Sequence, residues 1–329
     1  MKQRDPFFDN AKILLIVLVV LGHVLPIDLN NKANIVTYEW IFSFHMPLFV
    51  IISGYFTRIS SKDKFWNSIC NFAETFIIFS LIHVAFSYIQ GKSINVYQIL
   101  IIPRWTLWYL LCLIWWRIML YYTPSSIRNN HKILILFSII LCLVGGWIPI
   151  NSQISFQRTF AFLPFFIFGY IAGNNNFEIK VKKGKVLILF FLISIGFFYF
   201  IIPKTFNHLL YQNVCYFRGP LSSPFINFVL RVGWLFFASV MSICFLSLIP
   251  RKEYRWTHFG QLTLFIYMYH SVILSWRHIL RDEFHLPTNL FFCILYSIIV
   301  LGIIWLMAKS KFFHWLLNPI SSTIKKYKS

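Results

Sequence analysis

Charged side chains are scarce in this sequence, and acidic ones are the scarcest. Asp and Glu make up 10 of the 329 residues, all charged residues together make up 12%, and hydrophobic residues make up 58%. Because a soluble domain usually carries about 25% charged residues, this composition excludes a set of soluble modules. It predicts an all-α, polytopic transmembrane helix bundle that forms one domain over residues 1–329.

Cysteine patterns, cleavage signals and repeats are missing as well. The six cysteines are scattered without a C-x-x-C pair, and five lie in apolar runs, so we expect neither a disulfide framework nor a metal site. The first apolar run leads into His23 and Pro26 rather than an A-x-A cleavage site, which favours a retained first helix. We find no internal repeat and no low-complexity linker.

Apolar runs long enough for membrane spans recur from end to end, and we expect about ten of them. The expected spans cover about residues 8–25, 38–56, 66–89, 105–122, 132–148, 158–173, 186–202, 225–248, 260–280 and 289–307.

The distribution of positive charge predicts how these spans are oriented. With the N-terminus inside, cytoplasmic segments hold most of the lysines and arginines, so both termini are expected in the cytoplasm. The net charge of +20 is then explained by the orientation of the chain and by contact with anionic lipid and cofactor phosphates, and it does not indicate nucleic-acid binding. Residues 310–329 are expected to lie on the inner leaflet as an interfacial tail. The expected cytoplasmic cations are Lys2, Arg4, Arg58, Lys62, Lys64, Arg128, Lys132, Lys180, Lys182, Lys183, Lys185, Arg251, Lys252, Arg255, Lys309, Lys311, Lys325, Lys326 and Lys328, and those outside are Lys32, Lys92, Arg104, Arg158, Lys204, Arg218, Arg277 and Arg281.

The stretch from Asp9 to Phe56 places ionisable side chains inside apolar runs. Lys12 and His23 are eleven residues apart. That spacing is close to three helical turns, so both should point the same way, about 16 Å apart along the axis. Asp9 precedes Lys12 by three residues and can pair with it. A second histidine, His45, lies in the next apolar run.

That second run contains further features of interest. Pro47 is expected to free a carbonyl two turns into its helix and to open local space. Ser53-Gly54 permits a close approach of a neighbouring helix, and Ser53 can bond backbone or ligand.

Two interpretations of these residues are open. In the structural one, Asp9 and Lys12 form an interfacial ion pair and both histidines bond to neighbouring backbone. In the functional one, a histidine accepts a proton from a hydroxyl and Lys12 holds a phosphate-bearing cofactor. Because ionisable groups at membrane depth usually mark function, we favour the functional interpretation for the set.

Motifs throughout the chain support a family resemblance. Lys12 and His23 are separated by ten residues, and later motifs are Phe44-His45-Met46-Pro47-Leu48-Phe49, Ile52-Ser53-Gly54-Tyr55, Leu107-Trp108-Tyr109-Leu110, and residues 162–170 and 260–270. Together they resemble the membrane acyltransferase-3 family, and in particular polysaccharide and capsule O-acetyltransferases and fucose O-acetylase-like proteins. One departure is residues 69–76, which lack the arginines that family members often carry there.

The resemblance implies an O-acetyltransferase that moves an acetyl or other acyl group from cytoplasmic acyl-CoA to a hydroxyl of a cell-surface or lipid-linked glycan. Acetyl-CoA would be the co-substrate. The resemblance also implies that the protein is a multi-pass protein of a bacterial plasma membrane. The acceptor would be a glycan or a lipid-linked oligosaccharide, the chain would contact membrane lipid, and a homodimer is left open.

The resemblance also implies roles for single residues. His23 and His45 would be catalytic, Lys12 would contact CoA with Asp9 orienting it, and Arg58 would be a further phosphate ligand. Apart from the resemblance, Glu74 is either a partner for Arg58 or an unexplained cost, and we favour the partner. A shared protein-walled tunnel would join Lys12 to the two histidines. The expected substrate-binding residues are Ser53, Tyr55, Trp108, Arg158, Tyr267 and His270.

Several of these residues keep a structural alternative. Arginine beside tryptophan, as at Trp108 and Arg158, suits sugars and acidic glycans, but also ordinary interfacial anchoring. His270 is either a structural hydrogen-bond partner or a substrate contact, and Arg231 in the eighth expected span needs a partner or a cavity.

Two other functions compete with the enzyme. A transporter or flippase for a lipid-linked sugar predicts an internal repeat or paired broken helices. A non-catalytic membrane subunit or sensor predicts that replacing His23 leaves activity intact.

Overall fold

In the computed structural model, the described residues are 5–91, 101–103, 105–175, 184–200 and 207–320, and all their regular elements are helices. The expected cations Lys2, Arg4, Lys92, Arg104, Lys180, Lys182, Lys183, Lys204, Lys325, Lys326 and Lys328 lie outside these ranges. The helices are α1 (Pro6–Val24), α2 (Lys32–Phe42), α3 (His45–Phe56), α4 (Lys62–Ile89), α6 (Trp108–Tyr122), α7 (Ser125–Arg128), α8 (His131–Gly145), α9 (Phe156–Ala161), α10 (Leu163–Asn174), α11 (Lys185–Phe200), α12 (Asn207–Tyr211), α13 (Pro224–Leu248), α14 (Thr263–Leu274), α15 (Arg277–Asp282), α16 (Leu290–Met307) and α17 (Lys311–Leu317). Short 3₁₀ turns are η1 (Leu25–Ile27), η2 (Trp105–Leu107), η3 (Gln153–Ser155), η5 (Tyr216–Arg218) and η6 (Thr257–Leu262).

The all-helical fold is as expected, but the expected ten spans are not confirmed. Each expected interval contains helix, yet several are short or broken. By length and composition, five helical segments of the described residues can cross a membrane, and a sixth can if α9 and α10, bent by 57°, form one span. The five are Pro6–Ile27, Lys32–Phe56, Lys62–Ile89, Pro224–Leu248 and Leu290–Met307.

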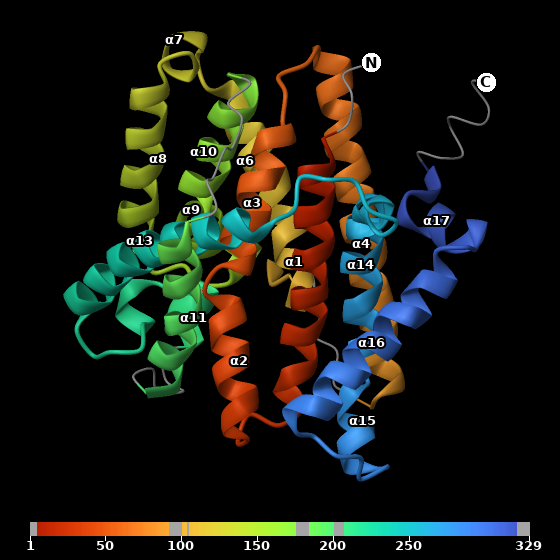
Figure 1. The fold of residues 1–329 in the computed structure, drawn as a ribbon. Helices are drawn as coiled ribbons and strands as arrows, with labels where there is room; N and C mark the ends of the chain where they lie inside the picture. The colour runs from red at the N-terminus through yellow and green to blue at the C-terminus, as the bar shows by residue number, and fades with distance from the viewer. Residues whose placement is uncertain (1–4, 92–100, 104, 176–183, 201–206, 321–329) are drawn as a thin grey trace.

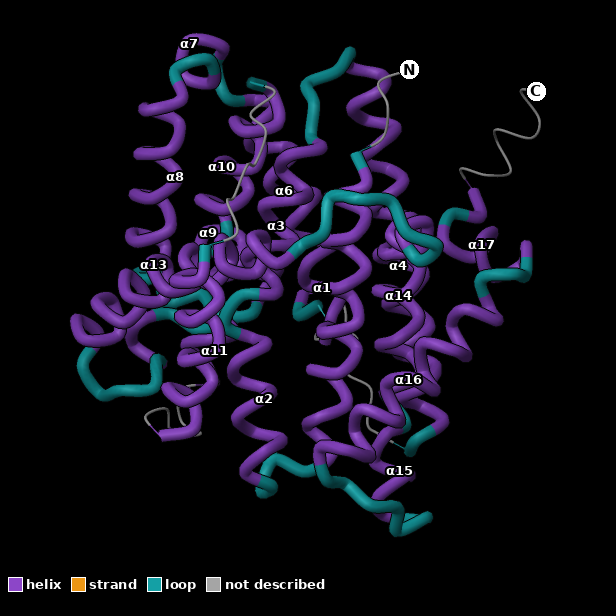
Figure 2. The backbone as a smooth tube through the Cα atoms, viewed as in Figure 1, coloured by secondary structure: helices purple, strands orange, loops and turns teal. Residues whose placement is uncertain are grey.

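The long helices near the N-terminus run up and down the bundle (Figure 1). The start of α1, the α3–α4 connection and α7 lie at one end of it. The α1–α2 connection and α15 lie at the other end. By contrast, α13 runs across the view, although its length and composition would allow it to cross a membrane. The tube in Figure 2 shows that the described connections differ in length, and that the one from α13 to α14 is long.

The helix expected over residues 38–56 is broken in two. It starts earlier, at Lys32, because the Asn31 side chain accepts hydrogen bonds from the N–H groups of Ala33 and Asn34. It breaks at Phe44, whose φ is −139°, and resumes as α3. Pro47 therefore sits in the first turn of α3, where a missing N–H is tolerated, and not two turns inside a helix as we expected.

Glycines bring α3 and α10 into the closest helix contact of the described fold. A Cβ added at Gly54 would overlap the backbone of Phe166 and Tyr170. One added at Gly169 would overlap the carbonyl group of Ile51, and Gly173 faces the α3 backbone in the same way. Side chains cannot fit there, so the two backbones touch directly, as the Ser53-Gly54 pair predicted.

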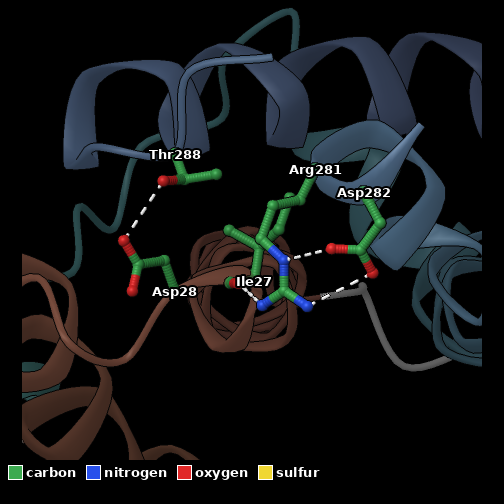
Figure 3. A network of polar contacts seen from close by, with 5 residues as sticks. All are labelled: Ile27, Asp28, Arg281, Asp282 and Thr288. Carbon is green, nitrogen blue, oxygen red and sulfur yellow. Dashed lines mark hydrogen bonds and ion pairs between the residues drawn. The ribbon is translucent and has the colours of Figure 1, made fainter. Parts of the chain in front are cut away.

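Polar side chains tie the two connections at the far end together (Figure 3). Arg281 donates to the carbonyl oxygen of Ile27 at 2.9 Å and pairs with Asp282 at 2.6 Å. Thr288 donates to Asp28 at 3.2 Å. The hydrogen bond from Arg281 lowers the pKa of the Asp282 carboxyl. This network holds the end of α1 beside the segment that follows α14.

The tail also forms a helix where the sequence predicted an interfacial segment. In α17, the carbonyl oxygen of Phe313 accepts a hydrogen bond from Tyr269 at 2.7 Å, and that of Leu317 accepts one from Thr75 at 2.9 Å. The described part of the tail therefore packs on α14 and α4 instead of standing apart.

We expect Gly169→Ala to destabilise the protein by about 1–3 kcal/mol, because the new methyl group must push α3 and α10 apart. Gly302→Ala is the matched control, since no atom lies within 4 Å of a Cβ added there. Thermal unfolding of the purified protein in detergent measures both. Equal unfolding midpoints for the two variants would contradict the direct backbone contact.

Candidate functional site

His23 lies in the last turn of α1, three turns after Lys12. The helix starts where it does because the Asp5 side chain accepts the Phe7 N–H at 2.9 Å and Pro6 occupies the first turn. Asp9 and Lys12 form the expected ion pair, with 2.6 Å between Nζ and Oδ1. The backbone of Asp9 touches Gly260, where no side chain would fit, so Asp9 is buried against η6 while the Lys12 side chain stays 20% exposed.

Rings from three elements surround the His23 imidazole. Its centroid lies 5.2 Å from His270 of α14, 5.2 Å from Trp105 of η2 and 5.6 Å from Phe42 of α2. Phe42 is also 4.7 Å from His45, so it separates the two histidines that we expected to act together. Within the described residues, His23 makes ring contacts and no hydrogen bond, which leaves its nitrogens available.

The hydrogen bonds of the other two histidines fix their neutral tautomers. His45 Nδ1 lies 2.7 Å from the carbonyl oxygen of Ile41, and His270 Nδ1 lies 3.0 Å from that of Ile266. A carbonyl oxygen only accepts, so each Nδ1 must carry the proton, and each Nε2 keeps its lone pair. The Nε2 of His270 is buried with no hydrogen-bond partner among the described atoms. Two imidazoles that can accept a proton therefore lie near His23.

His23 faces a cavity of about 390 Å³. Its walls are mainly aromatic, with two arginines and several small polar side chains, which is the composition of a small-molecule site. The described lining residues are His23, Pro26, Tyr38, Phe42, Ile102, Pro103, Trp105, Trp108, Ser152, Arg158, Tyr211, Asn213 and Arg277.

The backbone is strained around this cavity. Five described residues other than glycine have positive φ, and four of them belong to it or flank it in sequence. Trp105, with φ of 44°, lines the cavity, and Gln212 lies between two lining residues. Ile154 and Ser155 lie in the turn from Ser152 to Arg158; the fifth, His285, is elsewhere. Because such conformations persist only where the surroundings enforce them, their gathering here supports a built site.

Arg158 reaches the cavity because its neighbour Gln157 is anchored. Gln157 donates to three carbonyl groups, of Gly145, Ile148 and Ile150, at 2.7–3.0 Å. Its side-chain oxygen accepts hydrogen bonds from the buried Arg231 of α13 at 3.3 Å. The partner of Arg231 is thus Gln157 rather than a group in the cavity, and this hydrogen bond stabilises the turn before Arg158.

The expected substrate residues divide into two groups. Trp108 and Arg158 line the cavity with His23, and His270 packs on His23. Tyr267 packs on His270 with 5.6 Å between ring centroids, and its hydroxyl donates to the carbonyl oxygen of Thr106 at 2.6 Å.

Ser53 and Tyr55 lie on α3, away from the His23 rings. Ser53 bonds to the hydroxyl of Tyr109, and Tyr109 packs on Tyr267 with 5.3 Å between ring centroids. Ser53 is therefore joined through two tyrosines to His270, which packs on His23. Tyr55 packs on Phe8 at 4.2 Å instead, in a different aromatic cluster.

The shared tunnel from Lys12 to the histidines is not what the structure shows. Ile16 and Val19 lie between Lys12 and His23 on the same side of α1 and are 0% and 1% exposed. The described lining of the His23 cavity does not include Lys12. Apolar side chains fill this part of the α1 face because they pack closely against the neighbouring helices.

Cations at the Lys12 end of the fold are arranged differently from our expectation. Arg58 donates to the carbonyl oxygens of Tyr55, Thr57 and Gly173, so it closes the ends of α3 and α10. Glu74 accepts the N–H of Ile320, whereas the hydrogen bonds of Arg58 go to these carbonyl oxygens rather than to Glu74, the partner that we favoured.

The α13–η6 connection supplies cations that the sequence reasoning did not single out. Arg251 and Lys252 line a cavity of about 380 Å³, and Arg251 lies over the ring of Phe7 at 4.5 Å. Their proximity to α1 came from the tertiary fold, because some 240 residues separate Asn10 from the carbonyl groups of Pro250 and Lys252 to which it donates.

Comparison with known families identifies the chain. Residues 5–309 match the family described as an acyltransferase domain. The chain belongs to the acyltransferase-3 family. A 56-residue stretch is 48% identical to Nodulation protein NolL of Sinorhizobium fredii, covering 16% of this chain and 15% of that protein. No solved structure matches the chain.

Membership makes this chain an acyltransferase, and its long apolar helices make it a membrane protein. Nothing in the family or the fold favours a transporter. Among the described residues, no cluster of three or more His, Cys, Asp or Glu side chains could hold a metal ion.

We expect Arg231→Met in this acyltransferase to cost about 1–3 kcal/mol of folding stability, because Gln157 and two buried carbonyl groups lose their donor. The adjacent, exposed Val232→Met on α13 is the control and should change little. Thermal unfolding in detergent compares them. An unchanged midpoint for Arg231→Met would show that the anchor of the α9 turn lies elsewhere.

Proposed function

We propose that this protein is an O-acetyltransferase that moves an acetyl group from acetyl-CoA on the cytoplasmic side to a glycan hydroxyl. The observation that carries the proposal is the His23 imidazole lining an aromatic, arginine-containing cavity. Tryptophan and tyrosine rings with a few polar groups suit a sugar, and the family supplies the acyl chemistry. The acceptor is proposed to be a cell-surface or lipid-linked glycan, and the membrane a bacterial plasma membrane.

In this proposal His23 is the base. It takes the proton of the acceptor hydroxyl as the hydroxyl oxygen forms a bond to the acyl carbon, and the carbon–sulfur bond to CoA breaks. His270 lies beside it with a free lone pair on Nε2, so it can share or relay that proton. His45 keeps a base role in the proposal, acting past Phe42 from the start of α3.

The donor is proposed to bind at the other end of α1. Lys12, oriented by Asp9, and the loop cations Arg251 and Lys252 are the phosphate contacts. Arg58 is a weaker candidate than the sequence suggested, because its donors are occupied by carbonyl groups.

The acyl arm needs a route between the two ends. The side of α1 between Lys12 and His23 is packed with apolar residues. By contrast, side chains that carry polar groups lead from Ser53 through Tyr109 and Tyr267 to His270, joined by one hydrogen bond and two ring contacts. We propose that the pantetheine arm follows this tyrosine path, with its thioester at the His23 end.

We expect His23→Ala to lose about 10²–10⁴-fold in acetyl transfer to the glycan with normal membrane levels, as for loss of a general base. His45→Asn is expected to lose a similar factor. Asparagine can keep the donor to the Ile41 carbonyl but provides no base, so this variant separates anchoring from chemistry. Mass analysis of the modified glycan measures the transfer; full acetylation by either variant would remove that histidine from the mechanism.

We expect Lys12→Ala to weaken acetyl-CoA binding about tenfold, equal to about 1.4 kcal/mol, because a phosphate contact is lost. Lys12→Arg keeps the charge and should retain most of the affinity. Calorimetric titration of the detergent-solubilised protein with CoA measures both. An unchanged CoA affinity with collapsed turnover would mean that Lys12 does not hold the donor.

A further inference from the structure

The cavity at His23 has an unbalanced charge. Two arginines, Arg158 and Arg277, line it, and none of its described lining residues is acidic. A second cavity of about 550 Å³ shares Trp105 and Arg277 with it and adds His83 and His278, again with no acid among the described lining residues. A partly buried guanidinium without a counter-charge is unfavourable, so the site is prepared for an anion that is not part of the chain.

Arg277 has hydrogen-bonding capacity to spare. Its Nη1 donates to the carbonyl oxygen of Leu274 at 3.3 Å, while its Nε–H is buried without a partner among the described atoms. The guanidinium lies 5.0 Å from the ring centroid of Trp105, whose backbone is strained. Buried donors are nearly always satisfied in folded proteins, so an unpaired one at a cavity wall points to a ligand acceptor.

Arg158 has the same construction on another wall. It lies 4.6 Å from the ring centroid of Trp108, and its Nε donates to the carbonyl oxygen of Tyr211 at 3.0 Å. No described carboxylate pairs with it. Each arginine is thus held in place by a tryptophan face and one carbonyl group. This leaves both Nη groups of Arg158, and Nε and Nη2 of Arg277, for an incoming oxyanion.

We propose that the acceptor glycan is anionic, and that Arg158 and Arg277 bind its carboxylate or phosphate group. The inference rests on the proposed function and deepens it. The charged group lies between the two guanidiniums, the sugar ring lies against Trp105 and Trp108, and a hydroxyl of the same sugar or its neighbour faces His23. A neutral sugar would leave both arginines unpaired, so charge sets specificity.

The test uses the full chain in nanodiscs and pairs of acceptors in which one member carries the anionic group and the other does not. One pair is an oligogalacturonide and its methyl ester, and the other is a hexose 1-phosphate and the free hexose. Binding is followed by tryptophan fluorescence without CoA, and acetyl transfer by release of CoA thiol from acetyl-CoA. We expect the charged member of at least one pair to bind about tenfold tighter or better, and the pair that responds identifies carboxylate or phosphate.

Substitutions show whether the two arginines cause the preference. Arg158→Gln and Arg277→Gln should each reduce it to a small factor by weakening the charged member, with little effect on the neutral one. Arg277→Lys keeps the charge but not the fork, so it should retain part of the preference. Arg218→Gln, exposed and outside both cavities, is the control.

The two readouts separate failure of the inference from failure of the proposed function. Equal binding of the charged and the neutral member in both pairs overturns the inference, whether or not acetyl transfer is seen. A preference that survives both glutamine variants, or that acetyl-CoA abolishes by competition, also overturns it, because the anion site would then lie elsewhere or belong to the donor. Charge-dependent binding without any CoA release supports the anion site and counts against the acetyltransferase proposal.

Discussion

The direct backbone contact between α3 and α10 is the constraint on which the site depends. Helices in lipid gain little from burying apolar surface against each other, so close packing through glycine provides much of their attraction. Gly54, Gly169 and Gly173 allow that contact along the second half of α3. Because α3 begins at His45 and α10 follows α9, which carries Arg158, the contact sets the distance between the histidine side and the arginine side of the cavity.

Around this rigid pair, the site is made of breaks in helices. The break at Phe44 separates α2 from α3. Beside the cavity, the backbone has positive φ at four residues, Trp105, Ile154, Ser155 and Gln212. Irregular backbone at membrane depth survives where it is buried in protein or lines a cavity. The anchors that hold it are polar: Arg231 with Gln157 on one side, and Arg281 with the Ile27 carbonyl on the other.

The sequence predicted the helical class, the Asp9–Lys12 pair and the position of His23 in a special environment, because each depends on local spacing. It could not predict that Phe42 lies between His23 and His45, since the break before Pro47 moves the second histidine to a helix start. Arg251 and Lys252 were counted only as orientation charges, because their approach to α1 depends on bonds across some 240 residues. Arg277 was counted only as a charge on the outer side, and Tyr211 gave no local signal.

Because the side of α1 between Lys12 and His23 is packed, an acyl group in the proposed mechanism must reach His23 by another route. A tunnel along α1 would expose Ile16 and Val19, two residues that fill a well-packed core and gain nothing from contact with a polar thioester arm. The tyrosines between Ser53 and His270 already carry hydroxyl groups that can exchange their present partners for those of an arm. In the proposed function, an acyl group that follows this path arrives on the His270 side of His23, while the cavity proposed for the acceptor opens on the side of Trp105 and Arg277. The proposal thus puts one imidazole between two substrates, each entering from its own side, which is the arrangement that direct transfer requires.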